Sequence, residues 1–251
     1  MNFIVADIGN TFIKICTVDE KTLKIKRTNL IRSDKKINFL KINKIFKKKI
    51  RKEVLFASVV PQKFFLLKKY LKNKFDLKAT EIKSLNLKQL VKLDIKKPNQ
   101  VGSDRIANAI GVLKEYSSDS IVIDFGTATT FDVVFKKKIY SGGLIAPGID
   151  SSIKNLAEST ALLPIFKIKK TKKIIGKNTI EALRSGFYEG YSGLIDRIIF
   201  KIYKHYKKSF KIILTGGYAY LFKKNLNYKK VIVDKFLTIK GLVTIYRCNF
   251  L

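Results

Sequence analysis

Two short segments, about one domain length apart, carry residue types that bind phosphate. The first reads Asp7-Ile8-Gly9-Asn10-Thr11 and is followed by Lys14; the second reads Asp124-Phe125-Gly126-Thr127. A glycine in such a turn lets the backbone approach a phosphate, and exposed N–H groups can cradle the anion. Asp7 could hold a hydrated Mg²⁺, and Lys14 could reach the same phosphates as a point charge. Both segments are therefore candidate phosphate-binding turns.

Apolar runs on both sides of each turn predict β-hairpins. Phe3–Ala6 and Phe12–Ile15 flank the first turn, and Ile121–Ile123 and Phe131–Val134 flank the second. An ordinary hairpin uses the same turn residues, so one copy alone would indicate little about function. Two copies predict two similar α/β halves that hold a nucleotide between them.

A third candidate, Gly102-Ser103-Asp104-Arg105, stands at the start of a helix predicted over residues 102–116. In a purely structural interpretation Ser103 is the N-cap and Asp104 is favoured by the positive helix end. In a chemical interpretation Asp104 accepts a proton from a substrate hydroxyl, and Arg105 grips a substrate carboxylate through two hydrogen bonds. The residues alone leave both interpretations open.

Two further segments allow the same two interpretations. Thr215-Gly216-Gly217 follows a predicted strand and either admits a base or ribose against the backbone or forms a strand-to-helix turn. Thr179 opens a helix predicted to run to Lys208, where Asn178 and Glu181 fit a capping pair. A strand over Glu53–Val60, a helix over Gln62–Asn73 and a helix that starts near Asp150 complete the predicted framework.

Length and composition limit the class of protein. With 251 residues, of which 46% are hydrophobic, the chain is long enough for one large or two modest globular domains. The repeated hairpin favours two, residues 1–116 and 117–251. Two cysteines are too few for a disulfide framework or a four-thiolate zinc site. No apolar stretch is long enough to span a membrane, and Asp7 interrupts any signal peptide. We therefore expect a cytoplasmic location and no membrane partner.

The formal net charge of +33 raises polyanions as partners. Only seven of the 52 basic residues are arginine, and the lysines are spread along the whole chain. Recognition of bases and phosphates favours the arginine fork, so nucleic acid is expected to bind only non-specifically through charge. An A/T-rich codon bias would give the same excess of lysine, and the sequence does not separate these two origins of the charge.

In order and spacing, these motifs resemble those of the type III pantothenate kinases. Gly142–Gly148, Leu162–Pro164 and Thr215–Gly217 extend the resemblance over nearly the whole chain. The family implies an α/β fold of two ribonuclease-H-like domains, as in the acetate-and-sugar-kinase/heat-shock-protein/actin superfamily, with a nucleotide cleft between them. It also implies ATP-dependent phosphorylation of pantothenate, the first step of coenzyme A synthesis, by a homodimer that uses Mg²⁺ and a monovalent cation (K⁺ or NH₄⁺).

Roles follow from the resemblance position by position. Asp104 would be the general base, Asp124 would bind K⁺, and Thr179 would touch pantothenate near the dimer interface. Gly102, Ser103, Asp104 and Arg105 would line the pantothenate site, with Arg105 on the substrate carboxylate. The ATP phosphates would contact Thr127 and the first turn, that is Asp7, Ile8, Gly9, Asn10, Thr11, Phe12, Ile13 and Lys14.

One position departs from the family pattern. Three residues before Pro98 the family often has tyrosine, and this chain has Ile95. A contact to the substrate is then lost, which puts affinity and specificity in doubt. Two other functions remain open from the sequence: a regulatory or nucleic-acid-binding protein on the same scaffold, like the Bvg accessory factors, and a kinase for another small anionic acceptor.

Overall fold

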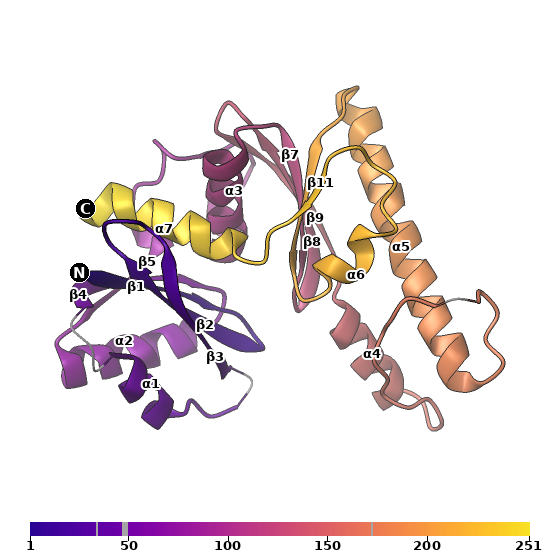
Figure 1. Ribbon diagram of the computed structural model, residues 1–251, viewed down its shortest axis with the longest axis horizontal. Coiled ribbons are helices and arrows are strands. Elements are labelled where there is room, and N and C mark those ends of the chain that lie inside the picture. Colours follow the sequence, from indigo (N-terminus) through magenta and orange to yellow (C-terminus); the bar gives the residue numbers. More distant parts are fainter. Residues whose placement is uncertain (34, 47–49, 172) are drawn as a thin grey trace. The chain divides into compact units, whose positions relative to one another are not determined.

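The predicted N-terminal hairpin forms one side of a five-stranded sheet. We describe a computed structural model of the chain, in which residues 1–33, 35–46, 50–171 and 173–251 are described (Figure 1). The first two strands are antiparallel, and the fourth and fifth run parallel to the first. The strand order is β3-β2-β1-β4-β5. The strands are β1 (Asn2–Ile8), β2 (Phe12–Asp19), β3 (Ile25–Arg32), β4 (Ile50–Ser58) and β5 (Lys78–Glu81).

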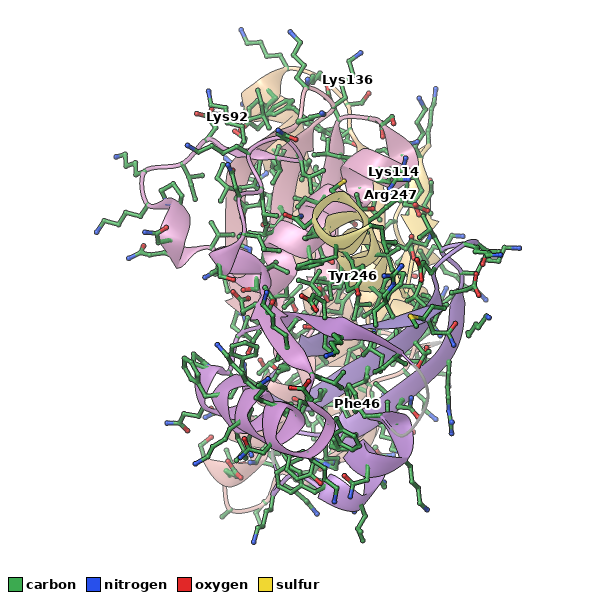
Figure 2. All side chains as sticks on the ribbon, turned by 90° about the vertical axis from the view of Figure 1, so that its left-hand side faces the viewer. Phe46, Lys92, Lys114, Lys136, Tyr246 and Arg247 are labelled. Carbon is green, nitrogen blue, oxygen red and sulfur yellow. The ribbon has the colours of Figure 1, made fainter. Side chains whose placement is uncertain are left out.

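Both faces of this sheet are covered by helices. Alternate residues of β1 point to opposite faces, so Ile4, Ala6 and Ile8 enter the core beneath α1 (Phe39–Phe46) and α2 (Pro61–Phe75). On the other face the ring of Phe3 stacks on Tyr246 of α7 at 4.0 Å between centroids. Figure 2 shows Tyr246 between α7 and the sheet, with Phe46 on the opposite side. The second face carries α3 (Ser103–Tyr116) and α7 (Leu237–Phe250).

Helices α3 and α7 pack backbone against backbone. A Cβ on Gly241 of α7 would lie closer than 3.0 Å to the carbonyl oxygen of Ala107 in α3, a separation that Cβ atoms essentially never show. The buried hydroxyl of Thr238 also donates to the Asn108 side-chain oxygen across 2.8 Å. The glycine therefore sets how closely the two helices approach.

The second predicted hairpin belongs to a six-stranded sheet. The strand order is β11-β10-β7-β8-β9-β6, with β10 parallel to both β7 and β11. Short β6 pairs parallel with the first residues of β9. The strands are β6 (Lys92–Leu93), β7 (Ser120–Phe125), β8 (Ala128–Phe135), β9 (Ile139–Pro147), β10 (Lys211–Gly216) and β11 (Val231–Val233).

Aromatic rings join this sheet to its helices. Phe222 of α6 stacks on Phe125 at the end of β7 (5.3 Å) and on Tyr188 of α5 (5.8 Å). Within the described ranges, no helix is both long and apolar enough to cross a bilayer. The remaining helices are α4 (Ile149–Glu158), α5 (Thr179–Tyr206) and α6 (Ala219–Lys223), with short 3₁₀ helices η1 (Ile82–Ser84) and η2 (Pro98–Gln100).

The chain divides into two compact units. Unit 1 holds residues 1–117, 134–142 and 236–251, and unit 2 holds residues 118–133 and 143–235. The C-terminal segment joins unit 1 because α7 packs on α3 and on β1. The predicted domain division, 1–116 and 117–251, remains a prediction; the chain first passes from unit 1 to unit 2 between Ser117 and Ser118.

The local predictions of helices and strands are confirmed with small shifts at their ends. The predicted helix 62–73 is α2, the helix 102–116 is α3, and the helix 179–208 is α5. Several elements were not predicted, among them β3 and α7. The strand β3 is polar and mostly exposed, and α7 follows directly from a loop that lacks a capping side chain.

The close approach of α3 and α7 gives a prediction. Alanine is better than glycine in a helix by about 1 kcal/mol, but overpacking costs about 1–3 kcal/mol. The obstructing atom at Gly241 is backbone and cannot rotate away, so the cost is expected at its upper end and the Gly241→Ala variant should lose about 2 kcal/mol of unfolding free energy. Urea denaturation measures it. The control is Cys248→Ala on the exposed side of α7, which should change the free energy by less than about 0.5 kcal/mol.

Candidate functional site

The first phosphate turn is a tight connection between β1 and β2. The N–H of Gly9 donates to the carbonyl oxygen of Phe12 at 3.0 Å, and Asn10 and Thr11 lie exposed at the tip. The N–H of Ser33 donates to the carbonyl of Thr11 at 2.8 Å, which ties the tip to the end of β3. The predicted turn is thus present, and its tip is open to a ligand.

Asp7 and Lys14 lie directly opposite one another in the antiparallel pair. Directly opposed residues point to the same face of a sheet. Both side chains are half-buried, and both project on the face that carries α3 and α7. The Lys14 ammonium lies 5.9 Å from the ring centre of Phe236, just before α7. A carboxylate and an amine therefore sit side by side at the base of the turn, as the predicted phosphate and Mg²⁺ roles require.

The first turn of α3 presents Asp104 and Arg105. Gly102 is the N-cap in an extended conformation, and the Asp104 carboxylate folds back over it so closely that a Cβ there would collide. The backbone N–H of Arg105 donates to Asp104 Oδ1 at 2.8 Å. Ser103 is fully buried and does not cap α3, because its hydroxyl donates to Glu81. The purely structural interpretation, in which Ser103 is the N-cap, is therefore wrong about the cap: the N-cap is Gly102.

Burial raises the pKa of the Asp104 carboxyl above its ordinary value of 3.8. The hydrogen bond from the Arg105 backbone, the Arg105 guanidinium and Lys83 oppose that rise, but desolvation is the largest cause. The Arg105 guanidinium carbon also lies 5.9 Å from the ring centre of buried Tyr140. A carboxyl whose pKa is raised toward neutrality is better matched to accept a proton at physiological pH.

One acidic residue of this region was not singled out from the sequence. Glu81 ends β5 and accepts hydrogen bonds from the Ser103 hydroxyl (2.5 Å) and from the backbone N–H of Lys83 (2.7 Å). No motif surrounds it. In the sequence, Glu81 is an ordinary glutamate next to a short polar segment, and such glutamates are common on protein surfaces.

The second phosphate turn lies in unit 2 and repeats the first with a shorter tip. The N–H of Gly126 donates to the carbonyl oxygen of Ala128 at 3.1 Å, and Thr127 is exposed between them. The hydroxyl of Ser151, in the first turn of α4, donates to the Thr127 carbonyl at 3.0 Å. The N-terminus of α4 therefore lies beside this turn, where its positive dipole end favours an anion.

Asp124 stands at the end of β7 opposite Thr215 of β10. The next residue, Gly216, has φ +83°, and a Cβ there would lie 2.7 Å from Asp124 Oδ1 and 2.5 Å from the Phe125 carbonyl oxygen. Glycine is required for both reasons. Beyond the turn, the Tyr218 hydroxyl donates to the Asp150 carboxylate. The Thr215-Gly216-Gly217 segment is thus held against the second phosphate turn.

Thr179 lies in the first turn of α5, behind the cap that was predicted. The Asn178 side chain accepts from the Glu181 N–H at 2.9 Å, and Glu181 accepts from the Lys177 N–H. Thr179 lines an open groove of about 780 Å³. Thr179 itself lies about 18 Å along the helix from Tyr191, whose hydroxyl bonds to Ser152 of α4. Within unit 2, Thr179 is therefore not grouped with Asp124 and Thr127.

Asp7 and Asp124 are suited to cations that bind only one or two protein side chains. Among the described residues, no group of three or more His, Cys, Asp or Glu side chains could hold a metal. Mg²⁺ keeps most of its waters and needs only one or two carboxylates, so half-buried Asp7 fits that ion. The Asp124 carboxylate and the Phe125 carbonyl, which both lie near Gly216, are oxygen ligands of the kind a monovalent cation takes.

Comparison with known proteins points to one family. The model of the type III pantothenate kinase family matches residues 3–201. The chain is 46% identical over 245 residues to a type III pantothenate kinase from Pelagibacter ubique, covering 96% of each chain. It is 38% identical over 250 residues to one from Sulfurihydrogenibium sp., covering 95% of this chain and 97% of the relative.

Solved structures agree on the fold. A conserved Baf family protein from Campylobacter jejuni matches with a TM-score of 0.62 at 21% identity, covering 98% of each chain. A ROK family protein from Streptococcus pneumoniae matches with a TM-score of 0.50 at 10% identity, also over 98% of each. At these identities the likeness concerns the fold alone. The predicted fold class is confirmed: an α/β fold with two sheets, shared with these solved structures.

The buried carboxyl of Asp104 gives a prediction about stability. Between its ordinary pKa and its raised pKa, the folded state keeps a proton that the unfolded state has released, so stability falls as pH rises through that window. Above that pH window the Asp104 carboxylate is charged and desolvated in the folded state, which lowers the free energy of unfolding. The Asp104→Asn variant should therefore have a larger free energy of unfolding than the wild type near pH 7, and no such gain below about pH 3.5.

The control variant, Asp76→Asn, should change the free energy of unfolding in the opposite direction. Hydrogen bonds from Lys72 and then Lys52 lower the pKa of exposed Asp76, so its contribution is present above its ordinary pKa and is lost as pH falls. Asp76→Asn should lower the stability slightly near pH 7. Urea titrations at the two pH values measure both variants. An Asp104→Asn variant that is less stable than wild type near pH 7 would contradict the desolvated carboxyl.

Proposed function

Because this chain belongs to the type III pantothenate kinase family, we propose that it phosphorylates pantothenate to 4′-phosphopantothenate at the expense of ATP. This is the first step of coenzyme A synthesis, and the proposal places the enzyme in the cytoplasm. The observation that carries the mechanism is the half-buried Asp104, whose carboxyl has a raised pKa next to Arg105 at the start of α3.

The proposed chemistry is a direct in-line transfer. Asp104 takes the proton of the primary hydroxyl of pantothenate as the hydroxyl oxygen attacks the γ-phosphorus of ATP and ADP leaves. Arg105 pairs with the pantothenate carboxylate, and its guanidinium rests on the ring of Tyr140. Ser103 and Gly102 complete the substrate-binding turn. No covalent intermediate on the protein is expected.

The phosphate groups of ATP are assigned to the two turns. Residues 8–13 at the first turn, with Lys14, and Thr127 at the second turn would contact them. Asp7 would hold Mg²⁺, which when bound neutralises charge that develops on the phosphoryl oxygens. Asp124 would hold the monovalent cation, K⁺ or NH₄⁺. In each case the assignment rests on the family resemblance and on the half-buried or turn positions described above.

The homodimer is part of the same proposal. Apart from the neighbouring residues and backbone of α5, no atom of the described residues lies within 4 Å of where a Cβ would stand on Gly186, Gly190 or Gly193, so this stripe could accept a second helix. Thr179 lies at the start of that helix and would touch pantothenate near the interface. Ile95, at the position where the family often has tyrosine, lies against Gly142 and offers no hydroxyl. Weaker pantothenate binding than in tyrosine-bearing relatives is expected.

The decisive measurement is pantothenate-dependent release of ADP by the purified protein in Mg²⁺ buffer. The Asp104→Asn variant should lose about 10²- to 10⁴-fold in turnover, because it cannot accept the proton, while ATP binding changes little. The matched control is Asp76→Asn, an exposed carboxylate of the same unit, which should keep wild-type turnover. Replacing K⁺ with Na⁺ tests the cation in the same assay. Equal turnover in Asp104→Asn would remove Asp104 from the role of base.

The charge of +33 is the observation that favours a second function, binding of nucleic acid. Lys92, Lys114 and Lys136 are examples of exposed basic side chains that point outward (Figure 2). We expect weak DNA binding, insensitive to sequence, that is lost between about 50 and 200 mM salt, because counterion release drives it. A fluorescence titration with two unrelated duplexes measures it. Sequence-dependent binding that persists at the higher salt would favour a regulatory role.

A further inference from the structure

The carboxylate of Glu81 joins three segments of unit 1. Its Oε1 accepts from the Ser103 hydroxyl at 2.5 Å and from the Ser58 backbone N–H at 3.4 Å. Its Oε2 accepts from the Lys83 backbone N–H at 2.7 Å. These donors belong to the first turn of α3, to the last residue of β4 and to η1. One half-buried side chain thus ties together segments that are distant in the sequence.

Two of these segments lead directly to the proposed reacting groups. Ser103 is fully buried and is followed by Asp104 in the chain. On the other side, Ser58 precedes Val59, whose N–H donates to the carbonyl oxygen of Ile8 at 3.1 Å. Ile8 is the residue after Asp7 and opens the first phosphate turn. A short path of hydrogen bonds therefore runs from the turn that bears Asp104, through Glu81, to the turn that would hold the phosphates.

We propose that Glu81 is a positioning residue for phosphoryl transfer: it fixes Asp104 relative to the first phosphate turn by holding Ser103 and Ser58 with one oxygen. The inference rests on the proposed function. Glu81 touches neither substrate in this scheme and acts through Ser103. Because a misplacement of about 1 Å can lower a rate about 10²-fold, the separation between base and phosphate turn is a quantity that a kinase must control.

The chemistry of the three partners requires a carboxylate. Each partner of Glu81 is a donor in this arrangement, and an ionised carboxylate has two oxygens that only accept. Glutamine would place an NH₂ group against either the Ser103 and Ser58 donors or the Lys83 N–H. The alternative role of Glu81 is structural, since its bond to Lys83 caps η1. Capping η1 requires only the hydrogen bond from Lys83, so the hydrogen bond from Ser103 points to a further role.

Steady-state kinetics separate the two roles. The variants are Glu81→Ala, Glu81→Gln, Ser103→Ala and the double variant Glu81→Ala/Ser103→Ala. The control is Glu158→Gln, an exposed carboxylate paired only with exposed Lys154. Glu81→Ala should lose about 10- to 100-fold in kcat, with the KM for ATP changed less than about threefold. The double variant should be no worse than the poorer single variant by more than about threefold, because both changes break one path.

Two kinetic outcomes would overturn the proposal. If both Glu81 variants keep wild-type kcat while their thermal midpoints fall, Glu81 is a cap of η1 and nothing more. If the losses in Glu81→Ala and Ser103→Ala multiply in the double variant, Glu81 does not act through Ser103. If Glu81→Ala does not fold, the same kinetic comparison is made with Glu81→Gln. All assays are run well below the thermal midpoint of each variant.

A second readout needs no activity and so separates this inference from the proposed function. The carboxyl carbon of Asp104 is followed by ¹³C NMR through a pH titration, with Asp104→Asn for assignment. Arg105 and Lys83 are the charged groups that act on Asp104, and Ser103→Ala alters neither. Loosening the turn should readmit water, so the Asp104 midpoint should fall in Ser103→Ala and stay unchanged in Glu158→Gln. An unchanged midpoint in Ser103→Ala would overturn the inference, whereas a wild type without pantothenate turnover would overturn only the function.

Discussion

The backbone contact between α3 and α7 is the constraint on which the rest of unit 1 depends. Gly241 leaves no room for a side chain against the Ala107 carbonyl, so the two helices pack as one layer on the sheet. The stack of Phe3 on Tyr246 anchors that layer to β1. Because the helices cannot slide without breaking these contacts, the first turn of α3 has a fixed place on the face that bears Asp7 and Lys14.

The same constraint explains how a carboxyl with a raised pKa is maintained. A free aspartate at a helix start would turn to water, where its pKa stays ordinary. Here the neighbouring Ser103 is buried and bonded to Glu81, and the Asp104 carboxylate folds over Gly102. Desolvation of the Asp104 carboxylate lowers the stability of the fold near neutral pH. The same desolvation raises the pKa of the carboxyl, which the proposed role as general base requires.

In unit 2, different contacts hold the second phosphate turn in place. Its phosphate turn is supported from one side by the start of α4, through Ser151, and from the other by the backbone of Gly216. Aromatic stacking of Phe222 between Phe125 and Tyr188 holds the end of β7 against α5. In both units the tip of a hairpin turn is exposed while its flanks are packed.

The sequence by itself determined the features that are local. The two hairpin turns, α2, α3 and α5 were predictable because turn residues, alternation and helical spacing act over a few neighbouring residues. The order of the motifs also identified the family. The assignment of Ser103 as a cap failed because its hydroxyl had a better partner 22 residues away in Glu81. The tertiary structure alone decided that bond, the raised pKa of Asp104 and the docking of α7, where Thr238 meets Asn108 across 130 residues. These features depend on contacts between distant segments, which local spacing does not encode.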